Sequence, residues 1–80
     1  MNKKRRLILD FLNDYHPEGL YATEMVRKSG GKLRRGSNYS YLSRMKEDGL
    51  VTSRKYDNRG FPRTKFFITE AGMDKLKSLK

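Results

Sequence analysis

Side chains that can form hydrogen bonds are concentrated between residues 37 and 47. At helical spacing, many of them share an outward face of small polar groups, opposite an apolar face. A helix that is merely solvated usually carries a ladder of Glu and Lys instead. The pattern therefore predicts a surface that contacts a partner. Its outward residues are Ser40, Ser43 and Glu47, flanked by Tyr39 and Arg44.

Residues suited to catalysis or metal binding are scarce in this sequence. His16 is the one histidine, it stands beside Pro17, and there is no cysteine. A zinc site would need carboxylates around that single histidine, and the nine carboxylates are scattered along the chain. Gly30 and Gly31 lack the preceding strand and following helix of a phosphate-binding loop. We therefore expect no catalytic residue, no metal and no cofactor, and do not expect an enzyme.

The positive charge is concentrated in the middle of the chain. Residues 27–65 hold 12 Lys or Arg and 3 Asp or Glu, which accounts for +9 of the formal net charge of +10. This distribution favours a polyanionic partner, with nucleic acid ahead of an anionic membrane surface. A separate basic group, residues 3–6, is equally compatible with a flexible arm that touches phosphate and with a solvated tail.

The length of 80 residues suits one domain with a small core, so we expect a single DNA-binding domain over residues 1–80 if the partner is DNA. The lack of cysteine fits a reducing compartment. The apolar run of residues 7–9 ends at Asp10, too soon for a signal core or a membrane span. The sequence predicts a soluble, cytoplasmic and nucleoid-associated protein.

Apolar residues at helical spacing indicate four helices. Ser37 and Thr69 are suited to cap the last two, because a hydroxyl can accept a hydrogen bond from a free amide one turn in. Leu9 lies well off the apolar stripe of the first helix, so we expect it to be exposed or to touch a second subunit. The inward face of the third helix holds Tyr41, Leu42 and Met45, and it also includes Asn38. The helices are expected over residues 3–15, 22–29, 38–48 and 70–79.

Two stretches rich in β-branched and aromatic residues, 50–56 and 63–68, predict the strands of a β-hairpin. The linker between them, residues 57–62, predicts a loop longer than the tight two-residue kind. Residues 20 and 21 could form a further short pairing segment. Three helices followed by such a hairpin make a winged helix-turn-helix. The predicted fold class is therefore α+β, mostly α, with a three-helix core, a two-stranded wing and a C-terminal helix.

The order of these motifs resembles that of PadR-type transcriptional regulators. Residues 36–51 read Gly-Ser-Asn-Tyr-Ser-Tyr-Leu-Ser-Arg-Met-Lys-Glu-Asp-Gly-Leu-Val. They are similar to the family's recognition-helix pattern, in which Tyr, Leu and Arg are followed by mostly acidic residues and Gly-Leu-Val. Residues 20–26 resemble the start of its second helix, and residues 63–72 its second wing strand and the helix start that follows. The resemblance covers residues 18–76, and MarR-like regulators, as near relatives, share parts of it.

The resemblance implies a protein that binds double-stranded DNA with its third helix in the major groove. Asn38 would then pair with adenine and Arg44 with guanine, while Arg59 at the wing tip would enter the minor groove. Alternation along the strands means that some basic residues of the wing must point away from DNA. Phosphate contacts or single hydrogen bonds are expected from Ser37, Tyr39, Ser40 and Ser43 on the helix, from Lys32, Arg34 and Arg35 before it, and from Arg54, Lys55, Arg59, Arg63 and Lys65 on the wing.

The same resemblance implies a transcriptional regulator, with repression by occupancy of an operator as the expected mode. Typical members continue into a longer C-terminal helical part that pairs two subunits, whereas this sequence ends at Lys80 and resembles a minimal member. Asn38 stands where the family often has an apolar residue. Two other functions stay open, a winged-helix module that docks on proteins and a binder of structured RNA. A homodimer is expected to pair through Leu9, Met73, Leu76 and Leu79.

Overall fold

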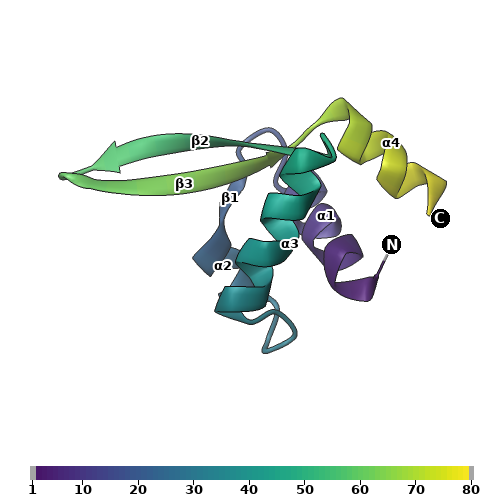
Figure 1. Ribbon diagram of the computed structural model, residues 1–80, viewed down its shortest axis with the longest axis horizontal. Coiled ribbons are helices and arrows are strands. Elements are labelled where there is room, and N and C mark those ends of the chain that lie inside the picture. Colours follow the sequence, from purple (N-terminus) through teal and green to yellow (C-terminus); the bar gives the residue numbers. More distant parts are fainter. Residues whose placement is uncertain (1, 80) are drawn as a thin grey trace.

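The computed structural model describes residues 2–79, apart from the side chain of Asn58. Within this range the helices form a body from which a long hairpin projects (Figure 1). The arrangement confirms the predicted α+β, mostly helical, winged helix-turn-helix fold. The elements are α1 (Lys3–Asp14), β1 (Leu20–Tyr21), α2 (Ala22–Lys28), α3 (Arg35–Glu47), β2 (Val51–Asn58), β3 (Phe61–Ile68) and α4 (Glu70–Ser78).

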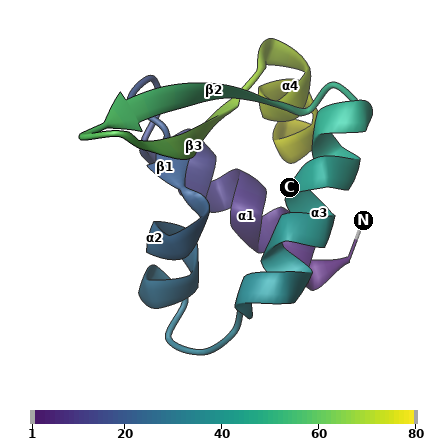
Figure 2. The same ribbon diagram turned by 60° about the vertical axis from the view of Figure 1, so that its left-hand side comes forward.

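Helix α1 packs against α3, β3 and α4 (Figure 2). Its residues Ile8, Leu9 and Leu12 are each 0% exposed. The prediction that Leu9 is exposed or touches a second subunit is therefore wrong. The reason is geometric, because partners on several sides bury a wider arc of a helix than the single apolar stripe that the periodicity suggested.

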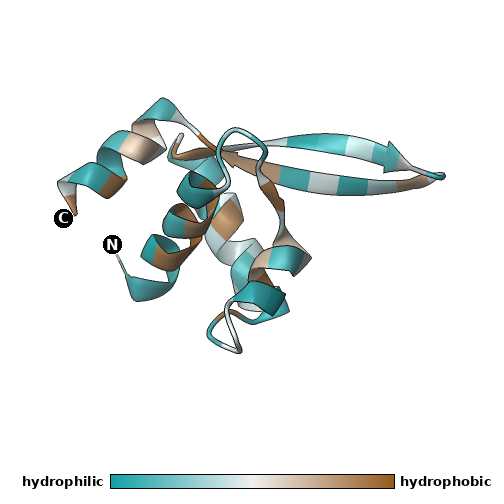
Figure 3. Cartoon of the chain, turned by 180° about the vertical axis from the view of Figure 1, so that it is seen from behind, coloured by the Kyte–Doolittle hydropathy of each residue, from teal (hydrophilic) through white to brown (hydrophobic). Residues whose placement is uncertain are grey.

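The other elements contribute one face each to the same core. Their buried hydrophobic residues join those of α1 in one cluster. Figure 3 shows that most of the hairpin is hydrophilic. None of the helices found in residues 2–79 has the length and apolar character needed to cross a membrane. The buried apolar residues outside α1 are Leu20, Ala22, Met25, Leu33, Leu42, Met45, Val51, Phe66, Ile68 and Leu76.

Hydrogen bonds from side chains to the backbone fix where the first two helices begin. The Asn2 Oδ1 accepts from the amide of Arg5 at 2.8 Å and caps α1. The Glu24 carboxylate accepts from the amide of Tyr21 at 2.9 Å and closes the first turn of α2. Each bond satisfies an amide that has no partner within its helix. At the other end of α2, Gly30 has a φ of +63°, which glycine adopts without strain.

Thr69 joins the start of α4 to the end of α3. Its Oγ1 accepts from the amide of Gly72 at 3.0 Å, which confirms the predicted cap. The same hydroxyl donates to the carbonyl of Gly49 at 2.7 Å, and the Thr69 amide donates to the carbonyl of Leu50 at 3.1 Å. One residue therefore sets both the entry into α4 and the distance of α4 from the α3–β2 junction.

The strands form an antiparallel sheet in the order β1-β3-β2. The short β1 pairs Leu20 with Phe66 and Tyr21 with Lys65, which confirms the pairing segment expected at residues 20 and 21. Strands β2 and β3 pair with each other along all 8 residues of each strand. Among the described residues, the part of β3 before Lys65 is bordered by β2 alone, so the outer hairpin is a two-stranded ribbon.

The hairpin turn is tighter than predicted. Both strands reach the tip, and only Arg59 and Gly60 connect them. Their φ values of +55° and +83° are those of a type I′ turn, which matches the twist of paired strands. The Asp57 Oδ1 accepts from the amide of Gly60 at 3.0 Å and holds the turn. The longer loop was predicted because residues 57–62 are rich in turn-forming residues. Pro62 is nonetheless part of β3, since proline is tolerated where one edge of its strand has no neighbour.

We expect Gly72→Ala to lower the free energy of unfolding by about 1–3 kcal/mol. A Cβ at this position would collide with the carbonyl oxygen of Leu50 and lie 2.7 Å from the Cγ1 of Ile68. Gly36→Ala is the control, since a Cβ on Gly36 in α3 meets nothing within 4 Å. That change should raise stability by up to about 1 kcal/mol through helix propensity. Urea denaturation of both variants decides the matter, and a neutral Gly72→Ala would contradict the packing of α4 on the α3–β2 junction.

Candidate nucleic-acid interface

The exposed face of α3 is polar and unobstructed. Tyr39, Ser40, Ser43, Arg44 and Glu47 line one shallow depression on its surface, as expected for the outward face. The opposite face of the helix is buried in the core through Leu42 and Met45. Apolar contacts on one side therefore hold α3 in place, while the side chains on the other side remain available to a partner.

Asn38 is not part of this exposed face. It is 0% exposed, and its Nδ2 donates to the carbonyl of Ala22 at 3.0 Å. The prediction that Asn38 contacts adenine is therefore wrong, because a side chain enclosed between α2 and α3 cannot reach a base edge. The spacing of Asn38 from Leu42 and Met45, four and seven positions, already places it on the core side of the helix. Its Oδ1 is buried and has no hydrogen-bond partner among the described atoms.

Helix α3 begins earlier than predicted. Its first residue is Arg35 and its N-cap is Arg34, which makes no capping bond through its side chain. Ser37 is consequently inside the first turn, and the prediction that it caps the helix is wrong.

Lys32, Arg34 and Arg35 are exposed at this end of α3, and the first turn holds no acidic residue. Positive charge at a helix N-terminus is unfavourable within the chain and favourable toward an anion.

The basic loop before α3 is anchored to the body of the protein. Leu33 is buried, and its amide donates to the Oγ of Ser29 at 3.0 Å. The Ser29 hydroxyl in turn donates to the carbonyl of Val26 at 2.7 Å. Lys4 donates to the carbonyl of Lys32, and residues 3–6 form the first turn of α1. Neither a flexible arm nor a solvated tail therefore describes that basic group, since it is helical and supports the loop.

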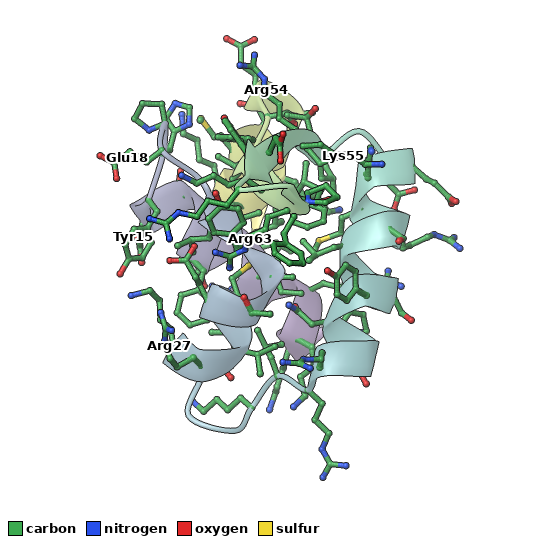
Figure 4. The ribbon with its side chains drawn as sticks, turned by 90° about the vertical axis from the view of Figure 1, so that its left-hand side faces the viewer. Tyr15, Glu18, Arg27, Arg54, Lys55 and Arg63 are labelled. Atoms are coloured by element: carbon green, nitrogen blue, oxygen red, sulfur yellow. The ribbon has the colours of Figure 1, made fainter. Side chains whose placement is uncertain are left out.

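The basic residues of the wing divide between its two faces. Arg54 pairs with Lys65 across the strands, and paired residues share a face. Lys55 pairs with Thr64 and belongs to the opposite face. Arg54 and Lys55 accordingly extend from opposite sides of β2, with Lys55 on the side of α3 (Figure 4). The basic residues of the wing therefore occupy both faces of the ribbon, as alternation along a strand predicts, and a single flat partner surface would meet only one of these faces.

Arg63 contacts neighbouring residues of the same chain. Its guanidinium carbon lies 4.0 Å from the centroid of the Tyr21 ring, and its terminal nitrogen donates to the Thr23 Oγ1 at 3.4 Å. Lys65 approaches the same ring, with its Nζ 5.4 Å from the centroid. These cation–π contacts fasten the base of the wing to β1 and the start of α2. Arg63 thus has a part in positioning the wing that its charge alone did not reveal.

A small cleft separates the wing from α3. Sequence reasoning missed two of its hydroxyl residues, Thr23 and Thr64, because nothing in their local pattern separates them from solvated positions. The pairing of residues 20 and 21 with the wing was the one signal that placed Thr23 near it. The lining residues are Tyr21, Ala22, Thr23, Tyr39, Pro62, Arg63 and Thr64.

The basic charge of this surface is almost unneutralised within the chain. Among residues 2–79, the one ion pair joins the Arg44 Nε to the Asp48 Oδ2 at 3.9 Å, one turn apart on α3. The same residues contain no group of three or more His, Cys, Asp or Glu that could hold a metal ion. The site therefore offers exposed cations and hydroxyl groups over α3, the loop before it and the wing.

A family comparison agrees with this geometry. Residues 8–78 match the family described as "Transcriptional regulator PadR-like family". The chain belongs to this family. The family is one of transcriptional regulators and not of enzymes. No match was found among curated proteins.

Solved structures of PadR proteins resemble the PadR-like chain along most of its length. A PadR-like transcription factor from "bacteroid fragilis" is 25% identical, with a TM-score of 0.80, and the match covers 95% of this chain and 75% of that one. A PadR family regulator from Clostridium difficile R20291 is 25% identical, with a TM-score of 0.79 and coverage of 98% and 83%. A MepR variant from S. aureus, bound to an oligodeoxyribonucleotide, shares the fold with a TM-score of 0.83 at 12% identity, over 98% of this chain and 54% of that one.

We expect Asn38→Ala to lower the free energy of unfolding by about 1–3 kcal/mol, because it removes a buried hydrogen bond and leaves a small cavity. Ser40→Ala, two positions along α3 on the exposed face, is the matched control and should change stability by less than about 0.5 kcal/mol. Urea denaturation measures both changes. Equal effects would contradict the burial of Asn38.

We expect Arg63→Ala to cost about 0.5–1 kcal/mol of stability through loss of the Tyr21 contact. Arg54→Ala is the control, since Arg54 lies on the same face of the wing and is exposed. It should leave the melting temperature nearly unchanged. Thermal unfolding of both variants, followed by circular dichroism, separates them. A drop for Arg54→Ala as large as that for Arg63→Ala would argue against a positioning part for Arg63.

Proposed function

We propose that residues 1–80 act as one DNA-binding domain, which regulates transcription by occupying a site on double-stranded DNA. The observation that carries the proposal is the set of exposed cations over α3, the loop before it and the wing, with one internal ion pair among the described residues. Membership of the PadR-like family supports it. A MepR variant with the same fold is bound to an oligodeoxyribonucleotide, which supports DNA as the partner.

In this proposal α3 lies in the major groove. Ser40, Ser43 and Arg44 project from its exposed face toward the bases, and Arg44 is suited to guanine through two parallel hydrogen bonds. Gly36 lies on the same helix with open space around it, so the backbone can approach DNA closely there. Ser37 and Tyr39 flank the reading face on opposite sides, since Ser37 borders the basic loop and Tyr39 the cleft beside the wing.

The remaining cations hold the phosphate backbone. Lys32, Arg34 and Arg35 are placed at the N-terminal end of α3, where the helix dipole adds to their attraction for an anion. On the wing, Lys65 and Arg63 have a lesser share in phosphate contact, because both already contact Tyr21. The wing residues assigned to DNA are Arg54, Lys55 and Arg59.

Repression by occupancy of an operator in the nucleoid, within the cytoplasm, is the mode we propose. Two copies would read half-sites about 34 Å apart, one turn of the double helix. Leu9 and Leu76 are buried and are not assigned to the contact between copies. Met73 and Leu79 are only partly buried, so the proposed pairing uses these two residues of the C-terminal region.

The proposal is tested by selecting bound duplexes from random-sequence DNA and measuring their affinity at several salt concentrations. If each chain neutralises about five phosphates, the logarithm of the association constant should fall with the logarithm of salt at a slope near −4.5 per chain. Arg35→Ala should make that slope shallower by about 0.9 without changing the preferred sequence. Arg44→Ala should change the preferred sequence.

Lys77→Ala is the control for these variants, because Lys77 is an exposed cation on α4, away from α3 and the wing. It should change neither the slope nor the preferred sequence. A slope near zero on duplex DNA would rule out the proposal. Equal competition by double-stranded RNA would also count against it, because the deep and narrow major groove of RNA does not admit a helix.

A further inference from the structure

The wing ends in a large apolar side chain that the core does not use. Phe61 is 75% exposed and follows directly after the turn. Figure 3 shows a hydrophobic segment close to the end of an otherwise mainly hydrophilic hairpin. Single exposed apolar side chains are common in proteins, but Phe61 differs from them in its position and its surroundings.

Strand pairing and the tight turn hold the backbone around Phe61. Phe61 pairs with Asn58 as the last pair of the ribbon, directly before the two-residue turn. The turn is closed by the hydrogen bond from the Gly60 amide to Asp57, and the proline that follows Phe61 restricts the next φ angle. An aromatic group held on such a backbone loses little conformational entropy when it enters another surface.

The tip is also far from the body of the protein. Eight paired residues per strand extend over roughly 27 Å at the usual rise of a β-strand. The molecule is 41 Å along its longest axis, in contrast to 26 and 21 Å along the other two, and the hairpin lies along that axis (Figure 1). The turn is therefore the leading end of an extended arm.

Charge identifies the partner of this tip as a polyanion. Arg59 adjoins Phe61 across Gly60, and Arg63 and Arg54 share a face of the ribbon with it. The nearby acidic residue, Asp57, already accepts a hydrogen bond within the turn. A second copy would bring the same positive wing toward this one and be repelled, whereas duplex DNA supplies both negative charge and flat apolar base pairs.

We propose that Phe61 is an apolar wedge that the wing inserts between two neighbouring base pairs from the minor groove, with Arg59 beside it in the groove. The wedge partly unstacks one base step and bends the duplex. Steps such as TA and CA unstack at the smallest energetic cost, so Phe61 adds sequence preference at a position that α3 does not touch. This inference rests on the proposed function, because it requires that the protein binds duplex DNA.

The test compares three variants on a duplex that the wild-type protein selects from random-sequence DNA. Phe61→Ala should lower affinity about tenfold, the net of apolar burial and the cost of unstacking. Phe61→Leu keeps an apolar wedge and should stay within about threefold of wild type. Tyr56→Ala is the matched control, since Tyr56 is an aromatic residue on the same face, 40% exposed and behind the tip, and it should also stay within about threefold.

Two further measurements separate a wedge from ordinary backbone contact. Replacing successive adenines of the duplex by 2-aminopurine should give increased fluorescence at one step with wild type and not with Phe61→Ala. Energy transfer between dyes at the duplex ends should report a smaller bend with that variant. The salt slope should not change, because no charge is removed, and thermal unfolding should be unchanged, because Phe61 is exposed.

The outcomes distinguish this inference from the proposed function. If Phe61→Ala binds and bends the duplex as wild type does, while Arg35→Ala still makes the salt slope shallower, the wedge is overturned and the proposed function stands. If wild type selects no duplex at all, both fall. Sedimentation that shows the free protein self-associating through Phe61, and a monomer for Phe61→Ala, would assign the side chain to a contact between copies and overturn the wedge.

Discussion

The burial of α1 between α3, β3 and α4 is the contact on which the other elements depend. Ile8, Leu9 and Leu12 are fully enclosed, so one helix supplies apolar surface to the recognition helix, the sheet and the C-terminal helix together. In a chain of 80 residues the core is small, and each such contact is a large share of the total stability. The exposed side chains of α3 and of the outer part of the wing, apart from Arg63, contribute little to that stability.

This division explains why the chain tolerates so many exposed cations. Arg34 and Arg35 oppose the dipole of their own helix, and self-repulsion among basic residues weakens the folded state. Arg44 has a carboxylate within reach, yet that pair is long and exposed and contributes at most about 1 kcal/mol. The unfavourable terms are small because solvent screens exposed charges. A bound polyanion reverses their sign, so stability and binding are linked through the same side chains.

The sequence predicted what depends on local pattern and missed what depends on neighbours. Helix order, the Thr69 cap, the hairpin and the outward face of α3 follow from periodicity and residue type. The burial of Leu9 does not, because it arises from helices and strands far away in sequence. The turn was misjudged because residues 57–62 are rich in turn-forming residues, and local sequence cannot show the empty strand edge at which Pro62 is tolerated. Asn38 is intermediate, since its spacing indicated the core but its polarity suggested a base contact, and the hydrogen bond to Ala22 resolves the conflict.

The unpaired edges of the wing have a consequence for the free protein. The outer edge of β2 and the part of β3 before Lys65 have no neighbouring strand among the described residues, and such edges are templates for joining another chain edge to edge. Pro62, which lacks an amide hydrogen, and the repulsion among Arg54, Lys55 and Arg63 work against that association. A wing stripped of its cations would therefore lose protection against aggregation as well as attraction for an anion. The composition of this hairpin is constrained even when no partner is bound.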